Sequence, residues 1–149
     1  MKLLVTILIA LRFAGTSLAG TCDVRRGTIE VPEDFIFAHT GTKDSFMGTL
    51  TRKSDGFSIH FDVGGMAGVH MHEGKQAQCT FFRKQRVGEL PAVTGIEPVA
   101  NGQRIAISIG EPAKAHQSPA NFWADITQPS DIADFLLIVT SYRLKPHEP

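Results

Sequence analysis

An alternation of apolar and polar residues in the middle of the chain constrains the fold more than any other feature. Read in order, these residues are Phe57, Ser58, Ile59, His60, Phe61, Asp62 and Val63. A period of two is typical of a β-strand that buries one face and leaves the other in water. The Asp55-Gly56 pair precedes this strand and separates it from another apolar run over 46–52. Because Asp-Gly favours a tight turn, the sequence predicts an antiparallel hairpin.

Shorter patterns predict further strands. Asn101-Gly102 lies between an apolar stretch over 97–99 and an alternating run over 104–109, which indicates a second hairpin because Asn-Gly also favours a tight turn. The remaining predicted strands cover residues 28–31, 78–83 and 121–126. The chain therefore reads as a series of short strands separated by turns.

The C-terminal part changes to the periodicity of a helix. Its apolar residues recur at helical spacing, at Ile132, Phe135, Leu136, Val139 and Tyr142. Pro129 suits a first helical turn, Asp131 suits the positive end of the helix dipole, and Pro146 ends the pattern. The β-branched run over 138–140 favours a strand instead, so this alternative stays open.

Taken together, these elements predict an α+β fold. We expect a mainly antiparallel β-sheet, arranged as a sandwich or an open barrel, with one C-terminal amphipathic helix packed on a face or an end. The length beyond residue 19 corresponds to a single globular β-rich domain over 20–149.

The first nineteen residues are typical of a cleaved secretory signal peptide. Lys2 precedes an apolar run over 3–11, and small residues at Ser17 and Ala19 place a cleavage site before Gly20. We therefore expect an exported protein, periplasmic or extracellular. A lipid anchor on Cys22 is not expected, because Thr21 stands where a lipobox carries a small residue.

The charge of the chain argues against a nucleic-acid partner, and its hydropathy argues against a transmembrane segment. Loss of Lys2 and Arg12 with the signal would leave slightly more acidic than basic residues, and no basic stripe marks a nucleic-acid binder. No transmembrane segment is expected, since the longest later apolar run, over 135–139, is far too short to cross a bilayer.

The chain has two cysteines, Cys22 and Cys79. In an exported protein such a pair is typical of one structural disulfide, which here would join the N-terminus of the domain to its middle. A redox or metal-binding role is the alternative, but neither cysteine belongs to a Cys-x-x-Cys motif.

One group of residues indicates a possible metal site. His70 and His72 are two residues apart, so on a strand their imidazoles would point to the same side and could share copper or zinc. His60, on the polar face of its strand, is a further candidate ligand, and the thioether of Met71 would suit copper(I). However, six histidines in a chain of this length make a chance His-x-His pair common.

The same residues resemble two metal-binding families at a few positions. The run 70–73, with Cys79 downstream, is similar to the copper-ligand strand of copper–zinc superoxide dismutases, and Gly64 followed by the two histidines is similar to a cupin motif. The dismutase zinc loop has no counterpart, because no histidine lies between His72 and Glu89. Gln76 or Ala77 occupies the position of the cupin glutamate. We assign the chain to neither family.

The sequence favours a small exported, non-catalytic binding or interaction module, with no catalytic residue assigned and the partner left open. The alternative is a copper- or zinc-binding protein or metalloenzyme that uses His70 and His72. No nucleophile elbow or zinc-protease motif supports an enzyme.

Overall fold

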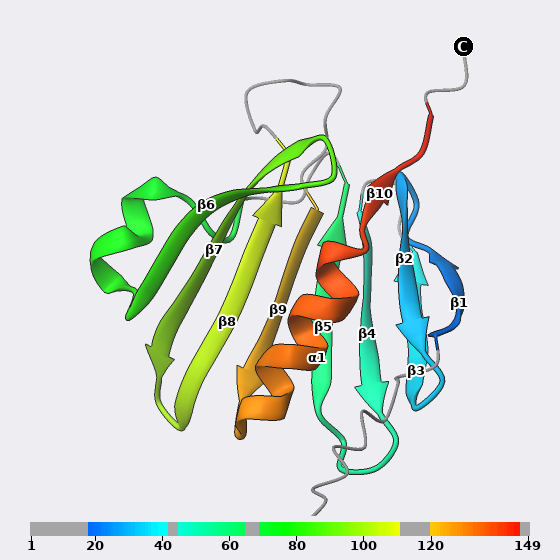
Figure 1. Ribbon diagram of the computed structural model, residues 1–149, viewed down its shortest axis with the longest axis horizontal. Coiled ribbons are helices and arrows are strands. Elements are labelled where there is room, and N and C mark those ends of the chain that lie inside the picture. The colour runs from blue at the N-terminus through cyan, green and yellow to red at the C-terminus, as the bar shows by residue number, and fades with distance from the viewer. Residues whose placement is uncertain (1–17, 42–44, 65–68, 111–119, 147–149) are drawn as a thin grey trace, which may run out of the picture.

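The computed structural model describes residues 18–41, 45–64, 69–110 and 120–146. In these residues the chain forms two open antiparallel β-sheets, one α-helix near the C-terminus and one short 3₁₀ helix (Figure 1). The predicted fold class is confirmed, and the sheets do not close into a barrel.

The larger sheet has seven strands in the order β3-β4-β5-β9-β8-β7-β6. Their bounds are Phe35–Gly41 (β3), Phe46–Arg52 (β4), Ser58–Val63 (β5), Phe81–Val87 (β6), Leu90–Val99 (β7), Gly102–Ile109 (β8) and Ala120–Ile126 (β9). Strands β3 to β5 form one meander and β6 to β9 form another. The two meanders meet where β5 pairs with β9, so the centre of the sheet joins distant parts of the chain.

The smaller sheet has three strands in the order β1-β2-β10, with bounds Leu18–Asp23, Gly27–Pro32 and Arg143–Leu144. Helix α1 spans Pro129–Thr140, and the 3₁₀ helix η1 spans Glu73–Gln78. In Figure 1, α1 crosses in front of the middle of the seven-stranded sheet, and β2 and β10 lie beside it.

The hydrophobic core lies between these two layers. We call the side of the large sheet that carries Ile59 and Phe61 the core face, and the side that carries His60 and Asp62 the outer face. Side chains of the core face pack with those of α1 and β2 in one buried cluster, which includes Ile29, Val31, Ile59, Phe61, Ile107, Phe122, Phe135, Ile138 and Val139. The predicted alternation over 57–63 is confirmed, because Phe57, Ile59, Phe61 and Val63 are buried whereas the residues between them are not.

One glycine allows the core to pack closely. A Cβ atom at Gly48 of β4 would lie 2.2 Å from the carbonyl oxygen of Ala38 and 2.4 Å from Cζ of Phe61. The absence of a side chain at Gly48 therefore leaves room for the Phe61 ring, which stacks on Phe37 and Phe46 with centroid distances of 5.6 and 5.9 Å.

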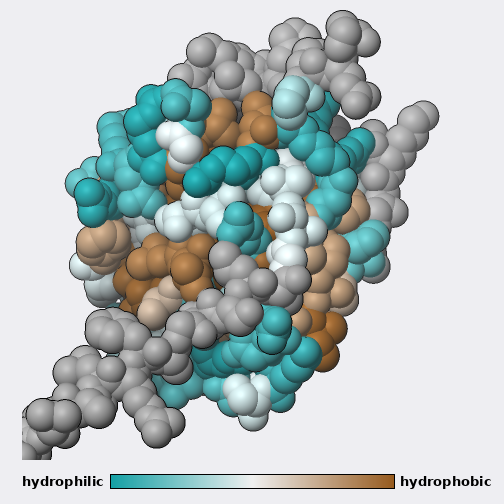
Figure 2. Space-filling model, turned by 45° about the vertical axis from the view of Figure 1, so that its right-hand side comes forward, coloured by the Kyte–Doolittle hydropathy of each residue, from teal (hydrophilic) through white to brown (hydrophobic). Residues whose placement is uncertain are grey.

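Some apolar side chains remain exposed. Leu137 of α1 and Leu144 of β10 are both 42% exposed. Figure 2, which turns the right-hand side of Figure 1 forward, shows apolar residues gathered into patches between polar ones. No helix in the described part of the chain is long and apolar enough to cross a membrane.

Both predicted hairpins are confirmed, as β4–β5 and β7–β8. Gly56 and Gly102 adopt positive φ angles of 79° and 141°, which glycine tolerates because it has no Cβ. The helix predicted from Pro129 is also confirmed, but it ends at Thr140. The prediction that the helical pattern continues to Pro146 is wrong. After the β-branched run the chain leaves the helix, and its next residues pair with β2 as strand β10.

The strand predicted over 78–83 is displaced. Residues up to Gln78 belong to η1, and β6 begins at Phe81 and continues to Val87. Arg83, Lys84 and Arg86 therefore lie within an edge strand, where charged side chains protect an open sheet edge from further pairing. Strands β1, β3 and β10 were not predicted.

The packing of the core face can be tested at Phe61, which is 1% exposed. Replacement of Phe61 by Ala should lower the free energy of unfolding by about 3–5 kcal/mol, because it removes a buried ring and leaves a cavity. Met47→Ala is the matched control, since Met47 lies on the outer face and is 43% exposed. Chemical denaturation measures both, and an unchanged midpoint for Phe61→Ala would contradict the assignment of the faces.

Candidate functional site

The outer face of the large sheet carries an aromatic group at its centre. His60 of β5 and Trp123 of β9 are direct cross-strand partners, so their side chains project from the same face. Their rings stack with centroids 5.6 Å apart and an interplanar angle of 14°. His70 adds a third ring, whose centroid lies 4.7 Å from that of Trp123 at a tilt of 53°.

Hydrogen bonds to the sheet hold His70 in this position. The backbone N–H of His70 donates to Oδ1 of Asn121 (3.1 Å), and the backbone N–H of Met71 donates to the hydroxyl of Ser108 (2.9 Å). The Ser108 hydroxyl in turn donates to Oδ1 of Asn121 (2.6 Å). Because Asn121 and Ser108 are buried partners on β9 and β8, this segment is fixed against the outer face.

Asp62 lies beside this group, one cross-strand row away from His60. Its Oδ1 atom is buried and has no hydrogen-bond partner among the residues that the structure describes. Burial raises the pKa of the Asp62 carboxyl, and the charge of His70 opposes that shift. Burial lowers the pKa of the His70 imidazole, and Asp62 opposes that shift. Both shifts favour the neutral forms, as expected for groups withdrawn from water.

A polar groove with a volume of about 600 Å³ lies next to the aromatic group. It is lined by Asp55, Gly56, Phe57, Ser58, His60, Asp125, Thr127 and Gln128. These residues come from the β4–β5 turn, from β5, from the end of β9 and from the connection to α1. His60 belongs both to the groove and to the aromatic group, so the two form one continuous candidate site.

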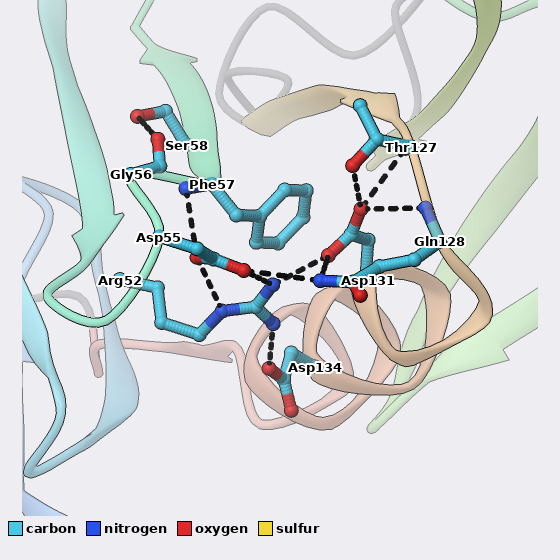
Figure 3. Close-up of polar contacts among 9 residues, drawn as sticks. All are labelled: Arg52, Asp55, Gly56, Phe57, Ser58, Thr127, Gln128, Asp131 and Asp134. Atoms are coloured by element: carbon cyan, nitrogen blue, oxygen red, sulfur yellow. Dashed lines mark hydrogen bonds and ion pairs between the residues drawn. The ribbon is translucent and has the colours of Figure 1, made fainter.

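Arg52, the last residue of β4, is hydrogen-bonded to Asp55, which lines this groove (Figure 3). Its guanidinium donates to Asp55 through Nε (2.9 Å) and Nη2 (2.6 Å), to Asp131 through Nη2 (2.6 Å), and also to Asp134. It lies 4.8 Å from the centroid of the Phe57 ring. Arg52 is 6% exposed and Asp131 is 0% exposed, so this ion pair is buried. The network joins the β4–β5 turn to the start of α1.

Asp131 also caps the start of the helix. Its Oδ2 accepts hydrogen bonds from the backbone N–H groups of Thr127 (2.9 Å) and Gln128 (3.0 Å) and from the Thr127 hydroxyl (3.0 Å). Gln128 Nε2 donates to Asp55 (3.0 Å), which links the two walls of the groove (Figure 3). The carboxylate of Asp131 therefore accepts hydrogen bonds at the helix N-terminus and also pairs with Arg52.

The carboxylates that line the groove are engaged in ion pairs. The hydrogen bond from Arg52, aided by that from the Phe57 N–H, lowers the pKa of Asp55 to about 2. Asp125 accepts from Nε (2.7 Å) and Nη2 (3.2 Å) of Arg104. Both carboxylates can accept hydrogen bonds from a ligand, and the lowered pKa of Asp55 keeps that carboxyl ionised at neutral pH.

The two histidines of the predicted metal site have different neighbours. His70 packs on Trp123, whereas the imidazole of His72 lies at Gly74, with Cε1 and Nδ1 each 3.1 Å from where a Gly74 Cβ would be. The expectation that they occupy a strand is wrong, because His70 lies in a bend and His72 is the N-cap residue of η1. In the described ranges no three His, Cys, Asp or Glu side chains are placed to hold a metal ion, and His60 pairs with Trp123 instead.

The expected disulfide is not formed, since Cys22 and Cys79 are both free cysteines. Cys22 lies on β1, where it packs against the core, and Cys79 follows η1. Figure 1 shows β1 and η1 on opposite sides of the molecule. A direct bond would require major rearrangement, because bonded cysteines need Cα atoms within about 7 Å of each other.

Sequence reasoning missed most residues of the candidate site, among them Trp123, Arg52 and the groove residue Asp125. The strand predicted over 121–126 does not by itself show that Trp123 faces His60, since that depends on the pairing of β5 with β9. Arg52 ends a strand next to Asp55, and this proximity is a weak sign of an ion pair. Comparison of the chain with known protein families and with characterised proteins finds no match.

The Arg52 network can be tested by Arg52→Met, which keeps the apolar stem and removes the charge. We expect the free energy of unfolding at pH 7 to fall by about 3–5 kcal/mol, because Asp131 would remain buried without its counter-charge. Arg86→Met is the control, since Arg86 is exposed and its ion pair with Glu89 spans 4.0 Å. Equal stability of Arg52→Met and the unmutated protein would contradict a structural role for the network.

The folding stability of Arg52→Met should also depend on pH differently from that of the unmutated protein. At Asp131, burial raises the pKa, but hydrogen bonds from Thr127, Arg52 and Gln128 outweigh it, and the net shift is downward, as at Asp55. A carboxyl whose pKa is lowered by folding stabilises the folded state at pH values above its ordinary pKa. This stabilisation is lost as the pH falls toward the lowered pKa of the folded state. Stability of the unmutated protein should therefore decrease between about pH 4 and pH 2. The decrease should be smaller in Arg52→Met.

Proposed function

We propose that this protein is an exported, non-catalytic binding module that holds a carbohydrate on the outer face of its large sheet. The observation that carries the proposal is the stacked pair of His60 and Trp123 beside the polar groove. The core face is committed to packing against α1 and β2, so the outer face is the side of the sheet that offers polar and aromatic groups together.

The groups at the site match the chemistry of a sugar ring. The C–H face of a pyranose packs on an aromatic ring, and tryptophan offers a large surface of this kind. The hydroxyl groups of the sugar need both donors and acceptors, which Ser58, Thr127, Gln128 and the two aspartates of the groove supply. A pocket that combines aromatic surface with a few polar groups is typical of a small-molecule site.

The charges of the groove favour binding over catalysis. Asp55 and Asp125 are each held by an arginine, and the lowered pKa of Asp55 keeps it ionised. A general acid would need a pKa near the working pH. The pairing of both carboxylates thus supports a role in ligand contact rather than in proton transfer.

Export is part of the same proposal, and it rests on the signal-like residues 1–19. Most of that segment lies outside the described residues, but β1 begins at Leu18. Cleavage before Gly20 would leave Gly20–Asp23 of β1, whose partners run from Val31 to Thr28 of β2. The proposed mature chain therefore keeps most of the β1–β2 pairing.

Intact-mass measurement of the protein recovered from the exported fraction tests this step. We expect a chain that begins at Gly20 and carries no lipid on Cys22. Replacement of Ala19 by a bulky residue such as Trp should block cleavage and serves as the control, because signal peptidase requires a small residue there. Recovery of the full-length chain in the cytoplasm alone would contradict export.

The binding proposal can be tested with the chain's single tryptophan as the reporter. We expect short neutral oligosaccharides of glucose, N-acetylglucosamine or mannose to change the fluorescence of Trp123 in a saturable way. His60→Ala should weaken binding about two- to twelvefold, equivalent to the 0.5–1.5 kcal/mol of an aromatic pair. Met47→Ala is the control, since Met47 projects from the same face but lies outside the groove.

Two results would overturn the carbohydrate proposal. One is the absence of a saturable change with all of these sugars at millimolar concentration. The other is equal affinity in His60→Ala and the unmutated protein, which would place the ligand elsewhere. Calorimetry with Trp123→Ala provides a readout that does not depend on fluorescence, and we expect it to detect no binding.

A further inference from the structure

A pair of sulfur atoms lies away from the groove, where the segment around η1 packs on β7. Cys79 Sγ is 3.9 Å from Met71 Sδ. Met71 is completely buried, and Cys79 is partly exposed. The Cys79 thiol also donates to the backbone carbonyl of Lys75 (3.3 Å).

The large sheet sets the positions of both sulfur atoms. A Cβ atom at Gly95 of β7 would lie 2.6 Å from Met71 Sδ and 3.0 Å from Cys79 Sγ, so the two side chains occupy the space that a glycine leaves. The Met71 backbone is tied to Ser108, and the Cys79 N–H donates to the carbonyl of Gln76 (3.2 Å). Both sulfur atoms are therefore held in place before any ligand arrives.

Their separation suits one metal ion bound to both. With metal–sulfur bonds of about 2.3 Å, sulfur atoms 3.9 Å apart subtend an angle of about 115–120° at the ion. This is close to the angle of about 120° between two ligands of a trigonal site. Thiolate and thioether are soft ligands, and together they favour Cu(I) over hard cations.

We propose that Cys79 and Met71 form a binding site for a soft monovalent metal ion, with Cu(I) as the ion it takes. On binding, the thiol proton passes to solvent, a Cu–S bond forms at Cys79, and the Met71 thioether donates a lone pair. The copper stays in the +1 state throughout, so no oxidant or reductant is consumed. The Lys75 carbonyl loses its hydrogen bond from the thiol.

This site is independent of the proposed carbohydrate site and of the predicted histidine pair. Its two ligands are sulfur atoms, and neither belongs to the residues that line the groove. Met71 lies between His70 and His72 in sequence, but its side chain is buried against Gly95, whereas His70 packs on Trp123. Binding of Cu(I) can therefore be present or absent whatever the groove binds.

The test is a titration of Cu(I) against a colorimetric Cu(I) chelator, without oxygen and with ascorbate, using the full mature chain. We expect one equivalent to bind to the unmutated protein. Cys79→Ser should weaken binding by more than about a hundredfold and Met71→Leu by about tenfold or more, since even outer-shell groups act on a 10–100-fold scale. Cys22→Ser is the matched control for a thiol, and it should bind as the unmutated protein does.

A second measurement covers the case in which Met71→Leu does not fold. Silver(I), a redox-stable probe of the same class, should shift the NMR signal of the Met71 methyl group in the unmutated protein. The exposed Met47 serves as an internal reference.

Three results would overturn the proposal. The first is unchanged Cu(I) affinity in Cys79→Ser, and the second is unchanged affinity in a folded Met71→Leu, which would reduce the site to a simple thiol. The third is loss of binding in a His70→Ala, His72→Ala double variant whose sulfur atoms are intact, which would assign the ion to the histidines.

Discussion

The buried guanidinium of Arg52 is the interaction on which the arrangement of the two layers depends. It contacts three carboxylates that come from two places, Asp55 in the β4–β5 turn and Asp131 and Asp134 in α1. Withdrawal of such charges from water is costly, so the network is stable only if the turn and the helix meet in the correct geometry. Arg52 therefore specifies how α1 starts against the sheet, in addition to the apolar contacts of Phe135 and Val139.

The position of α1 decides which side of the large sheet can serve a ligand. The helix and β2 cover the core face, and the polar residues of β5 and β9 project from the opposite side. Asp55 and Gln128 both line the groove and belong to the hydrogen-bond network of Arg52, so these parts of its wall are held by the same contacts that hold the helix. The candidate site is thus rigid where it meets the core.

The segment around Met71 has no regular secondary structure but is fixed against the outer face of the large sheet. Residues around Met71 are anchored by Asn121 and Ser108, and Gly95 leaves the space for the Met71 side chain. This packing brings His70 onto Trp123 and brings Met71 next to Cys79. Residues that are far apart in the chain, 70 and 123, form one aromatic group for this reason.

The sequence by itself determined the local elements, because their signals are local. The period-two run over 57–63, the Asp-Gly and Asn-Gly turns and the helix start at Pro129 each depend on a few neighbouring residues, and each is present in the structure. It did not determine β10, a two-residue strand that exists only because it pairs with β2. Nor could it show that the histidine pair would lie outside the strands or that the cysteines would lie far apart. Only the tertiary structure decided which distant side chains meet, since the pairing of β5 with β9 creates the site around Trp123. Such long-range pairing depends on the packing of the whole core, which no short stretch of sequence encodes.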